Sequence, residues 1–337
     1  MYSFKNDYSE LGHEKVLSDL LKLSNKQMDG YGLDSVCAEA KDLIKKRFAL
    51  DNADIHFISG GTQTNMILCG SVLSPINAVI AADTGHICGH ECGAIERNGN
   101  KILTAFNKDG KLLPGDIESI CNEHTDEHMV KPKLVYISQS TEKGTVYKKQ
   151  ELKNLFSVCR KLNLFLFIDG ARLAAALTCE GMDIKPEEMG ELCDAFYIGG
   201  TKNGSPLGEA LCIINDKIKE GFRYYLKQNG ALLAKGALIG SCFKTLFTDD
   251  LYFENARRSN SMTRKIARAL TAKGYKMSCD SPANLILPVL PNEKIAELRK
   301  HFIFHDWEKA GENNTVVRLV CGWAADEAEV DKFISLL

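Results

Sequence analysis

The feature that most constrains the fold of this chain is an alternation of short apolar segments with amphipathic helical stretches between about residues 55 and 215. The apolar segments are rich in β-branched and aromatic residues, which is typical of buried strands. Seven strands are expected, at 55–59, 78–82, 101–104, 133–138, 164–168, 195–199 and 210–214. Stretches between them, such as 150–161, carry apolar residues at helical spacing. This order predicts an α/β fold with a mostly parallel seven-stranded sheet flanked by helices.

A change of pattern after residue 245 predicts a second, smaller α+β domain. A long helical stretch at 252–273 precedes strand-like segments at 284–289 and 315–321, and helices are expected at 292–301 and after Asp326. We therefore expect a large, ligand-binding domain at 26–245 and a small C-terminal domain at 246–337. The N-terminal segment 1–25, with a helix at 13–23, is expected to pack with the small domain.

The charge balance argues against several classes of partner. The 337 residues include 42 Lys and Arg against 44 Asp and Glu, which gives a formal charge of −2. Such a balance creates no strong field for nucleic acid or a membrane surface. No apolar stretch approaches the roughly 20 residues that cross a bilayer, and the N-terminus is too polar for a signal peptide. We expect a cytoplasmic protein with neither kind of partner.

The 12 cysteines show no framework spacing and fall largely in apolar segments, which favours reduced, buried thiols over disulfides. The one regular pattern is the alternation of His86, Cys88, His90 and Cys92. On a strand these side chains would follow one another at about 6.5 Å along one face, too far apart to close around a single zinc ion without a sharp turn. We therefore expect no metal site.

Two polar blocks follow successive apolar segments. Asp169 ends the segment before it and is followed by Arg172, whereas Lys202 lies 33 residues beyond Asp169 in a glycine-rich turn after the segment 195–199. A carboxylate at a buried strand end requires a partner, and a buried lysine with a lowered pKa is the usual nucleophile for a Schiff base. Taken singly, Asp169 is also compatible with a helix cap and Lys202 with a surface loop.

A glycine-rich turn after the first expected strand is a candidate phosphate site. Gly60, Gly61 and Thr62 lead into a helical stretch, where free backbone N–H groups bind anions. The turn lacks the endings typical of nucleotide P-loops and dinucleotide folds, so it favours a phosphate monoester. A turn with no ligand is the alternative.

Three further side chains complete the candidate site. His86 follows the strand expected at 78–82, where it either stacks on an aromatic ligand or caps the backbone. Arg172 and Arg318 interrupt apolar surroundings, and a guanidinium with five donors is seldom buried without a partner. Each arginine either binds an anionic ligand or bridges the two domains.

Together these groups describe one ligand, pyridoxal phosphate carrying an amino acid. The phosphate belongs at Thr62, the protonated ring nitrogen at Asp169, the aldehyde at Lys202, the ring face at His86, and the substrate carboxylate at Arg172 and Arg318.

At this point the sequence resembles the aspartate aminotransferase-like (fold type I) pyridoxal enzymes, and among them the threonine aldolase and aromatic amino acid β-eliminating lyase group. The resemblance extends over nearly the whole chain and is carried by the blocks 4–7, 31–34, 59–65, 86–91, 142–147, 168–173, 199–204 and 317–323. The blocks Asp-Gly-Ala-Arg and Gly-Gly-Thr-Lys-Asn-Gly, at this spacing, are its most specific elements.

The resemblance implies roles for individual residues. It makes Lys202 the Schiff-base lysine, Asp169 the partner of the pyridine nitrogen and His86 the ring stacked on the cofactor. It makes the turn of Gly60, Gly61 and Thr62 the phosphate cup, and Arg172 and Arg318 the ligands of the substrate carboxylate.

Three positions depart from the relatives. Asn6, a candidate substrate ligand, replaces the serine of the familiar bacterial threonine aldolases. The loop 138–143 lacks their histidine. Lys235, a candidate cofactor ligand, stands where relatives place an arginine that reaches the neighbouring subunit's phosphate. The resemblance therefore implies a homodimer or homotetramer with shared sites.

The activity that the resemblance implies is cleavage of a β-hydroxy-α-amino acid, of the threonine, allo-threonine or phenylserine type, to glycine and an aldehyde. The base for the β-hydroxyl is left open among His86, Lys202 and a water molecule. Alternatives on the same fold are a β-eliminating lyase and an aminotransferase. A non-catalytic binding protein is disfavoured because it would need no Schiff base, and a nicotinamide enzyme because the glycine fingerprint is missing.

Overall fold

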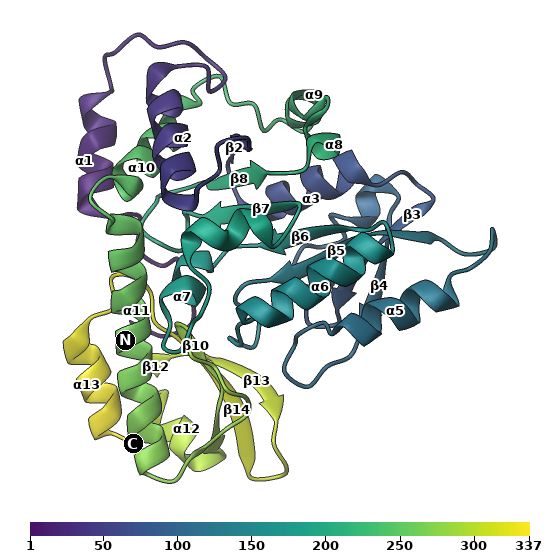
Figure 1. The fold of residues 1–337 in the computed structure, drawn as a ribbon. Coiled ribbons are helices and arrows are strands. Elements are labelled where there is room, and N and C mark those ends of the chain that lie inside the picture. Colours follow the sequence, from purple (N-terminus) through teal and green to yellow (C-terminus); the bar gives the residue numbers. More distant parts are fainter.

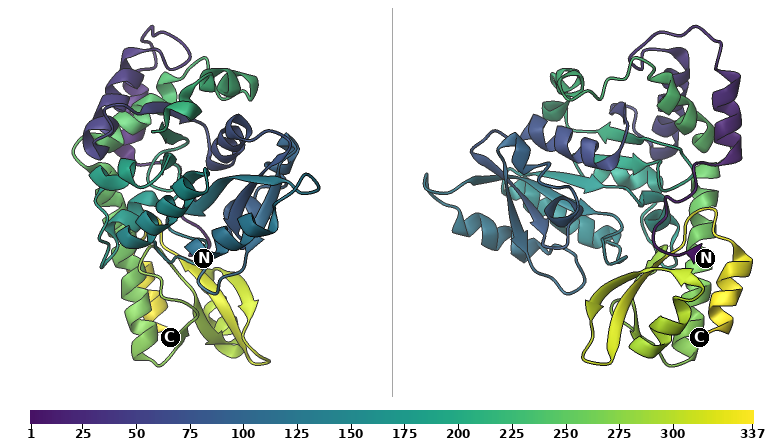
Figure 2. Two further views of the ribbon diagram at one scale, coloured as in Figure 1. Left: turned by 45° about the vertical axis from the view of Figure 1, so that its right-hand side comes forward. Right: turned by 180° about the vertical axis from the view of Figure 1, so that it is seen from behind.

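The computed structural model describes residues 1–337, arranged in two domains that share one long helix (Figures 1 and 2). The large domain contains a seven-stranded sheet with the order β2-β8-β7-β6-β5-β3-β4. Only β8 runs antiparallel to its neighbours, so the predicted mostly parallel sheet is confirmed. Its strands are β2 (Asp54–Ile58), β3 (Asn77–Ala82), β4 (Lys101–Ala105), β5 (Lys131–Ser138), β6 (Phe165–Asp169), β7 (Ala195–Gly199) and β8 (Glu209–Ile213).

Helices cover both faces of this sheet, which explains why its strands are apolar without interruption. One face is covered by α1 (Glu14–Lys22), α2 (Ser35–Phe48), α5 (Pro114–Glu123), α6 (Lys149–Lys161), α7 (Leu173–Thr178) and α10 (Ala237–Phe247). The other is covered by α3 (Gly61–Val72), α4 (His86–Gly89), α8 (Asp216–Lys219) and α9 (Phe222–Gln228). In β6, Leu166 and Ile168 pack on the first face and Phe167 on the second.

The small domain is a β-sheet covered by helices. Its strands are β9 (Lys276–Met277), β10 (Leu285–Ile286), β11 (Pro288–Pro291), β13 (His305–Lys309) and β14 (Asn314–Val320), and its helices are α12 (Asn292–Leu298) and α13 (Glu327–Ser335). The strand expected at 284–289 is thus two strands. Both pair with β14 in one register, and the break falls at Leu287, directly before Pro288, which has no N–H to donate. The Asp326 side chain accepts a hydrogen bond from Ala328 N (2.9 Å) and caps α13 as expected.

The long helix α11 (Leu251–Ala272) runs from one domain into the other (Figure 1). Its first turns, with Tyr252 and Phe253, belong to the core of the large domain, whereas Ile266 and Leu270 belong to that of the small domain. The two hydrophobic cores therefore meet along this helix rather than at a loop.

The N-terminal segment is divided between the two domains. Strand β1 (Tyr2–Ser3) pairs in parallel with β12 (Phe302–Ile303), and Phe4 is buried in the small-domain core. Helix α1 instead packs on α10, and its Val16 lies in the large-domain core. The association with the small domain expected for 1–25 holds only for the residues before α1, because the apolar face of α1 fits α10.

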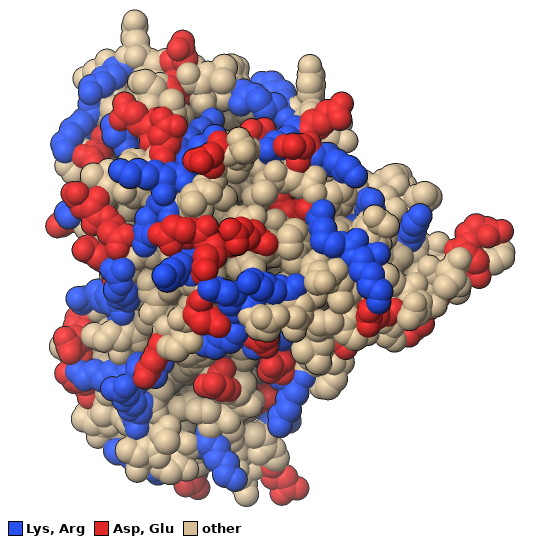
Figure 3. Space-filling view, in the orientation of Figure 1, with Lys and Arg blue, Asp and Glu red and all other residues tan.

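The surface carries acidic and basic side chains interspersed over the face shown in Figure 3. None of the helices combines the length and the apolar character that crossing a membrane requires. All 12 cysteines are free thiols, and most of them are buried.

Candidate active site

A cavity of about 670 Å³ opens at the carboxyl ends of the parallel strands, where α/β folds place their ligands. The small domain closes one of its sides. Its walls bring together four of the residues singled out from the sequence, His86, Arg172, Lys202 and Arg318. The other lining residues are Tyr8, Thr84, His90, Glu142, His305, Asp306 and Trp307.

Lys202 reaches the cavity from the turn after β7. The Glu209 carboxylate fixes this turn by accepting hydrogen bonds from Gly200 N (2.9 Å) and Thr201 Oγ1 (3.0 Å). Burial of the Lys202 amine, together with the nearby charge of Arg172, lowers its pKa. A larger fraction of the amine is therefore neutral and nucleophilic than at an exposed lysine.

Asp169 ends β6 in a buried hydrogen-bond network. Its Oδ2 accepts from Tyr136 Oη (2.6 Å) and Asn65 Nδ2 (3.0 Å), and its Oδ1 accepts from Tyr197 Oη (2.5 Å) and Ala171 N (3.0 Å). Burial acts to raise the pKa of this carboxyl, but the charge of His86 and the tyrosine hydrogen bonds outweigh it, so the pKa is lowered. Asp169 is thus a buried carboxylate anion, and it does not cap α7, which begins four residues later.

Gly170 permits the close contact between the ends of β6 and β7. A Cβ at this position would lie 1.7 Å from the carbonyl oxygen of Tyr197. No side chain can occupy that space, so the glycine of the Asp-Gly-Ala-Arg block keeps the chain beyond Asp169 against the strand that leads to Lys202.

His86 begins the one-turn helix α4. Its Nδ1 is hydrogen-bonded to Glu91 Oε1 (2.7 Å), which also accepts from Asn65 Nδ2 (2.7 Å). Burial acts to lower the pKa of His86, but Glu91, Glu142 and Asp169 reverse the effect and raise it. Since Asn65 also donates to Asp169, one buried amide connects the two groups.

This geometry corrects the sequence-based picture of the His86–Cys92 segment. Residues His86–Gly89 form the helical turn α4 and the chain then turns through His90 to Cys92, so the segment is not a strand, and Cys88 Sγ donates to Ala82 O (3.3 Å).

The two arginines differ in their partners. Arg172 is buried and donates from Nε (2.7 Å) and Nη2 (3.1 Å) to the carboxylate of Asp7, which is also bonded to Asn284. Arg318 has a buried Nε without a partner, and its guanidinium lies 5.8 Å from the centre of the Trp307 ring. Burial, together with the charge of Arg172, lowers the pKa of Arg318. A carboxylate entering the cavity would find its unused donors on Arg318.

A β-bulge helps to shape the wall around Arg318. The register between β13 and β14 shifts between Asp306 and Glu308, which leaves Trp307 without a residue opposite it. Bulges commonly redirect a side chain, and here the indole lines the cavity beside Arg318.

The glycine-rich turn occupies the N-terminus of α3. Gly60 is the N-cap residue, and no side chain caps the helix, so the first backbone N–H groups remain available to an anion. A Cβ on Gly61 would lie 3.0 Å from the hydroxyl of Tyr197, which itself binds Asp169. Gly61 therefore lies beside the Tyr197 hydroxyl, which belongs to the Asp169 network.

Six of the candidate residues do not line the cavity: Asp169 and the turn of Gly60, Gly61 and Thr62, described above, and Asn6 and Lys235. Asn6 uses its Oδ1 to accept hydrogen bonds from Tyr8 N and Ser9 Oγ (both 3.0 Å) and so stabilises its own turn. Lys235 is exposed in the turn before α10 and lines a different hollow with Met28 and Leu238.

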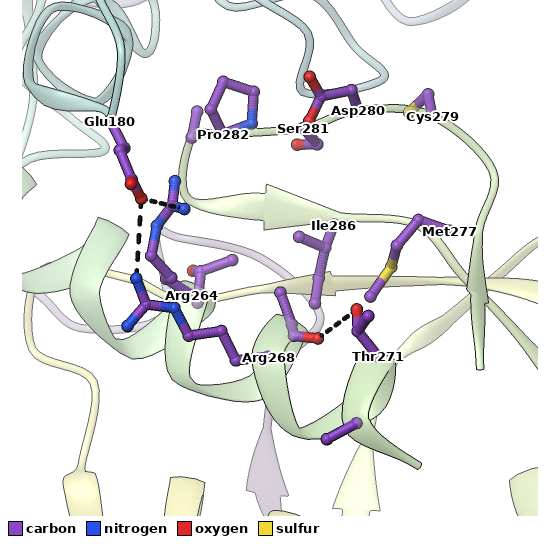
Figure 4. A pocket seen from close by; sticks show the side chains of 14 residues that line it. Glu180, Arg264, Arg268, Thr271, Met277, Cys279, Asp280, Ser281, Pro282 and Ile286 are labelled. Carbon is purple, nitrogen blue, oxygen red and sulfur yellow. Dashed lines mark hydrogen bonds and ion pairs between the residues drawn. The ribbon is translucent and has the colours of Figure 1, made fainter. Parts of the chain in front are cut away.

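A further hollow lies where α11 meets the small domain (Figure 4). Glu180 forms ion pairs there with Arg264 and Arg268, and Cys279 and Ser281 line the opposite side. It contains none of the residues singled out from the sequence.

Several residues of the site were not assigned a role from the sequence, namely Glu142 in the cavity wall and Asn65, Glu91, Tyr136 and Tyr197 in the hydrogen-bond network of Asp169 and His86. Asn65, Glu91 and Glu142 end or begin blocks that carry the family resemblance, which was the one available signal. Tyr136 and Tyr197 read as ordinary core residues of strands.

The residues present fit pyridoxal phosphate. A buried amine of lowered pKa and an arginine with an unused donor line the cavity. A buried anionic carboxylate and an uncapped helix start lie on either side of the Tyr197 hydroxyl. These match in charge the phosphate, the pyridinium nitrogen, the aldehyde and the carboxylate of an amino acid.

Comparison with known proteins supports the same assignment. The family profile described as "Beta-eliminating lyase" matches residues 17–287. A low specificity L-threonine aldolase of Pseudomonas sp. (strain NCIMB 10558) is 32% identical over 306 residues, 89% of this chain and 86% of the relative. The solved structure of Leishmania major threonine aldolase superposes with a TM-score of 0.98 at 46% identity, covering 100% of this chain and 98% of the other.

A more distant match concerns the fold alone. A Thermus thermophilus aspartate aminotransferase superposes with a TM-score of 0.72 at 15% identity. The fold type I architecture and the family resemblance predicted from the sequence are thus both confirmed. The chain belongs to the beta-eliminating lyase family, the pyridoxal phosphate-dependent lyases that include the threonine aldolases.

Proposed function

We propose that this protein cleaves the Cα–Cβ bond of a β-hydroxy-α-amino acid of the threonine, allo-threonine or phenylserine type to give glycine and an aldehyde. The observation that carries the proposal is the meeting of Lys202, Arg172 and Arg318 in one cavity beside the Asp169 network. The relatives that match nearly the whole chain are named threonine aldolases, which favours carbon–carbon cleavage over β-elimination or transamination.

Each residue has a defined task in this proposal. Lys202 would hold pyridoxal phosphate through its aldehyde, Asp169 would keep the ring nitrogen protonated, and His86 would lie against the ring. The backbone of Gly60, Gly61 and Thr62 holds the phosphate. Bound pyridoxal phosphate supplies an electron-withdrawing ring that stabilises negative charge at Cα.

The substrate carboxylate binds Arg318, with Arg172 beside it. Arg172 remains paired with Asp7, so it has few donors left for the substrate. Its contribution is mainly the positive charge that it places beside the substrate carboxylate. Asn6 precedes Asp7, and the Asn6 side chain stabilises the turn that holds Asp7 against Arg172.

The direct test is to incubate the purified protein and pyridoxal phosphate with a panel of β-hydroxy amino acids and measure glycine and aldehyde together. Equimolar release of both products is expected from at least one substrate. Formation of ammonia and an oxo acid instead would indicate β-elimination and overturn the proposal.

Arg318→Lys is expected to raise KM for the amino acid by about 10- to 100-fold, because an ammonium cannot reproduce the bidentate grip of a guanidinium. Steady-state kinetics measure KM, and a cofactor titration should show unchanged binding of pyridoxal phosphate. Arg257→Lys is the control, because this exposed arginine pairs with Asp250 and neither residue lines the cavity. Weakened cofactor binding with unchanged KM would assign Arg318 to a different role.

We further propose that the protein is a homodimer or homotetramer with shared sites. Leu21, Met28, Leu33 and Leu238 expose 74%, 36%, 67% and 42% of their surface on and beside α1, α2 and α10. Exposed apolar side chains gathered in one region are typical of a protein interface. Ile239, which follows Leu238 in α10, does not belong to this surface, because it packs in the core of its own subunit.

Lys235 lies in this region, and we expect it to contact the cofactor phosphate of a neighbouring subunit. Lys235→Glu and Lys202→Ala homo-oligomers should each be inactive, and mixing them should restore part of the activity, because some sites then combine both native residues. Sedimentation and activity after verified subunit exchange measure the effect. A monomer, or exchange without recovery, would contradict a shared site at Lys235.

A further inference from the structure

Glu142 is a buried carboxylate in the same cavity as Lys202. It lies on the loop that follows β5, at the carboxyl edge of the sheet. This loop lacks the histidine that the familiar bacterial relatives carry, and the base that acts on the β-hydroxyl was left open by the sequence.

The loop holds Glu142 in a fixed position. Thr141 N donates to Thr145 O (2.9 Å), and the side chain of Gln139 is hydrogen-bonded to both backbone groups of Tyr147 (2.9 Å each). From the small domain, Cys279 Sγ donates to the carbonyl oxygen of Lys143 (3.1 Å). The loop is therefore closed on itself and anchored from both domains.

The surroundings keep Glu142 ionised. Burial acts to raise the pKa of its carboxyl, but the charges of Arg172, Lys202, His86 and Arg318 lower it below the ordinary value. These cations come from the segments after β6, β7 and β3 and from β14. A substrate carboxylate on the arginines would offset part of this positive charge and so make Glu142 more basic.

His86 Nδ1 and the other nearby carboxylates already have partners within the protein. His86 is bonded to Glu91 through Nδ1, and Asp306, the other carboxylate in the cavity wall, is paired with Arg299 (2.6 Å). Asp169 accepts four hydrogen bonds. Glu142 lines the cavity, where its carboxylate can accept a hydrogen bond from a substrate.

We propose that Glu142 is the base that accepts the β-hydroxyl proton of the substrate, an inference that rests on the proposed lyase function. The O–H bond breaks as its proton passes to the carboxylate oxygen, the C=O bond of the aldehyde forms, and the Cα–Cβ bond breaks. The electron pair of the broken Cα–Cβ bond stays on Cα, and Cα takes up one proton after the aldehyde leaves. Glu142 then gives up the proton that it accepted, directly or through water, so the reaction neither gains nor loses a proton.

The test compares two reactions of Glu142→Gln. Cleavage of the β-hydroxy amino acid should fall by about 100-fold or more, the usual contribution of a general base. Exchange of the Cα proton of glycine with deuterated solvent involves no β-hydroxyl, so it should stay within about threefold of the native rate. Fluorescence titration should show unchanged binding of pyridoxal phosphate.

Two further variants make the result decisive. Glu142→Asp keeps the carboxylate and should recover part of the cleavage rate, which also provides an answer if Glu142→Gln fails to fold. Glu180→Gln makes the same substitution in the hollow of Figure 4, outside the active site, and should leave both reactions unchanged.

Other outcomes overturn the inference. Cleavage within about threefold of native in Glu142→Gln would show that another group takes the proton. Parallel loss of cleavage, exchange and cofactor binding would make Glu142 a structural residue. If the native protein exchanges the glycine proton but cleaves no β-hydroxy amino acid, the proposed lyase function fails, whatever the variants do.

Discussion

Lys202→Ala is expected to lower turnover by about four orders of magnitude or more, the scale seen when a covalent nucleophile is removed. The lysine borders an open cavity, so its removal takes away little packing and the variant should fold. Circular dichroism and thermal melting measure the fold, and steady-state assays measure turnover.

The chemical role of Lys202 can be measured without turnover. Borohydride reduction of the native holoenzyme should fix the cofactor to the peptide that contains Lys202, and peptide mass spectrometry should locate it there. Lys276→Ala, at an exposed edge strand, is a matched control and should behave as native. Full turnover by Lys202→Ala, or labelling of another lysine, would remove Lys202 from the mechanism.

Asp169→Asn is expected to lower turnover by about 100- to 1000-fold. The substitution keeps the shape of the side chain but removes its charge, so the pyridine nitrogen is no longer held in its protonated form. An electrostatic contribution of about 3 to 4 kcal/mol corresponds to that loss. Single-turnover kinetics measure the effect, and the cofactor absorption spectrum should shift with it.

Asp194→Asn is the control for Asp169→Asn. Asp194 is a buried carboxylate at the opposite edge of the sheet, where it accepts from Leu166 N (2.8 Å) and pairs with Arg160. Its neutralisation should lower the melting temperature and leave the chemistry intact. If Asp169→Asn behaves in the same way, with less than a tenfold loss of turnover, Asp169 serves structure alone.

The sequence determined the order of elements and the ends of the central strands. Each of the seven predicted strands of the large domain lies within two residues of an observed one, because burial on both faces makes these segments apolar throughout. The placement of Asp169 and Lys202 followed from the same signal, since each comes where an apolar strand ends and a glycine-containing turn begins.

The tertiary structure decided which polar groups meet. Arg172 and Asp7 are 165 residues apart in the chain, and Asn65 reaches Glu91 and Asp169 across 26 and 104 residues. Such pairs produce no periodic pattern in the sequence, because each partner by itself is also compatible with a position on the surface. Glu142 was likewise only one residue of a family block until the fold placed it in the wall of the cavity that Lys202 also lines.

The division of the N-terminal segment has the same origin. The pattern of α1 shows an apolar face but not the surface that the face will cover, and only the packed structure places it on α10 instead of the small domain. Local periodicity therefore determined whether each segment forms a helix or a strand. Which segments touch, and which side chains share the cavity, depended on contacts between distant parts of the chain that exist only once both domains are folded.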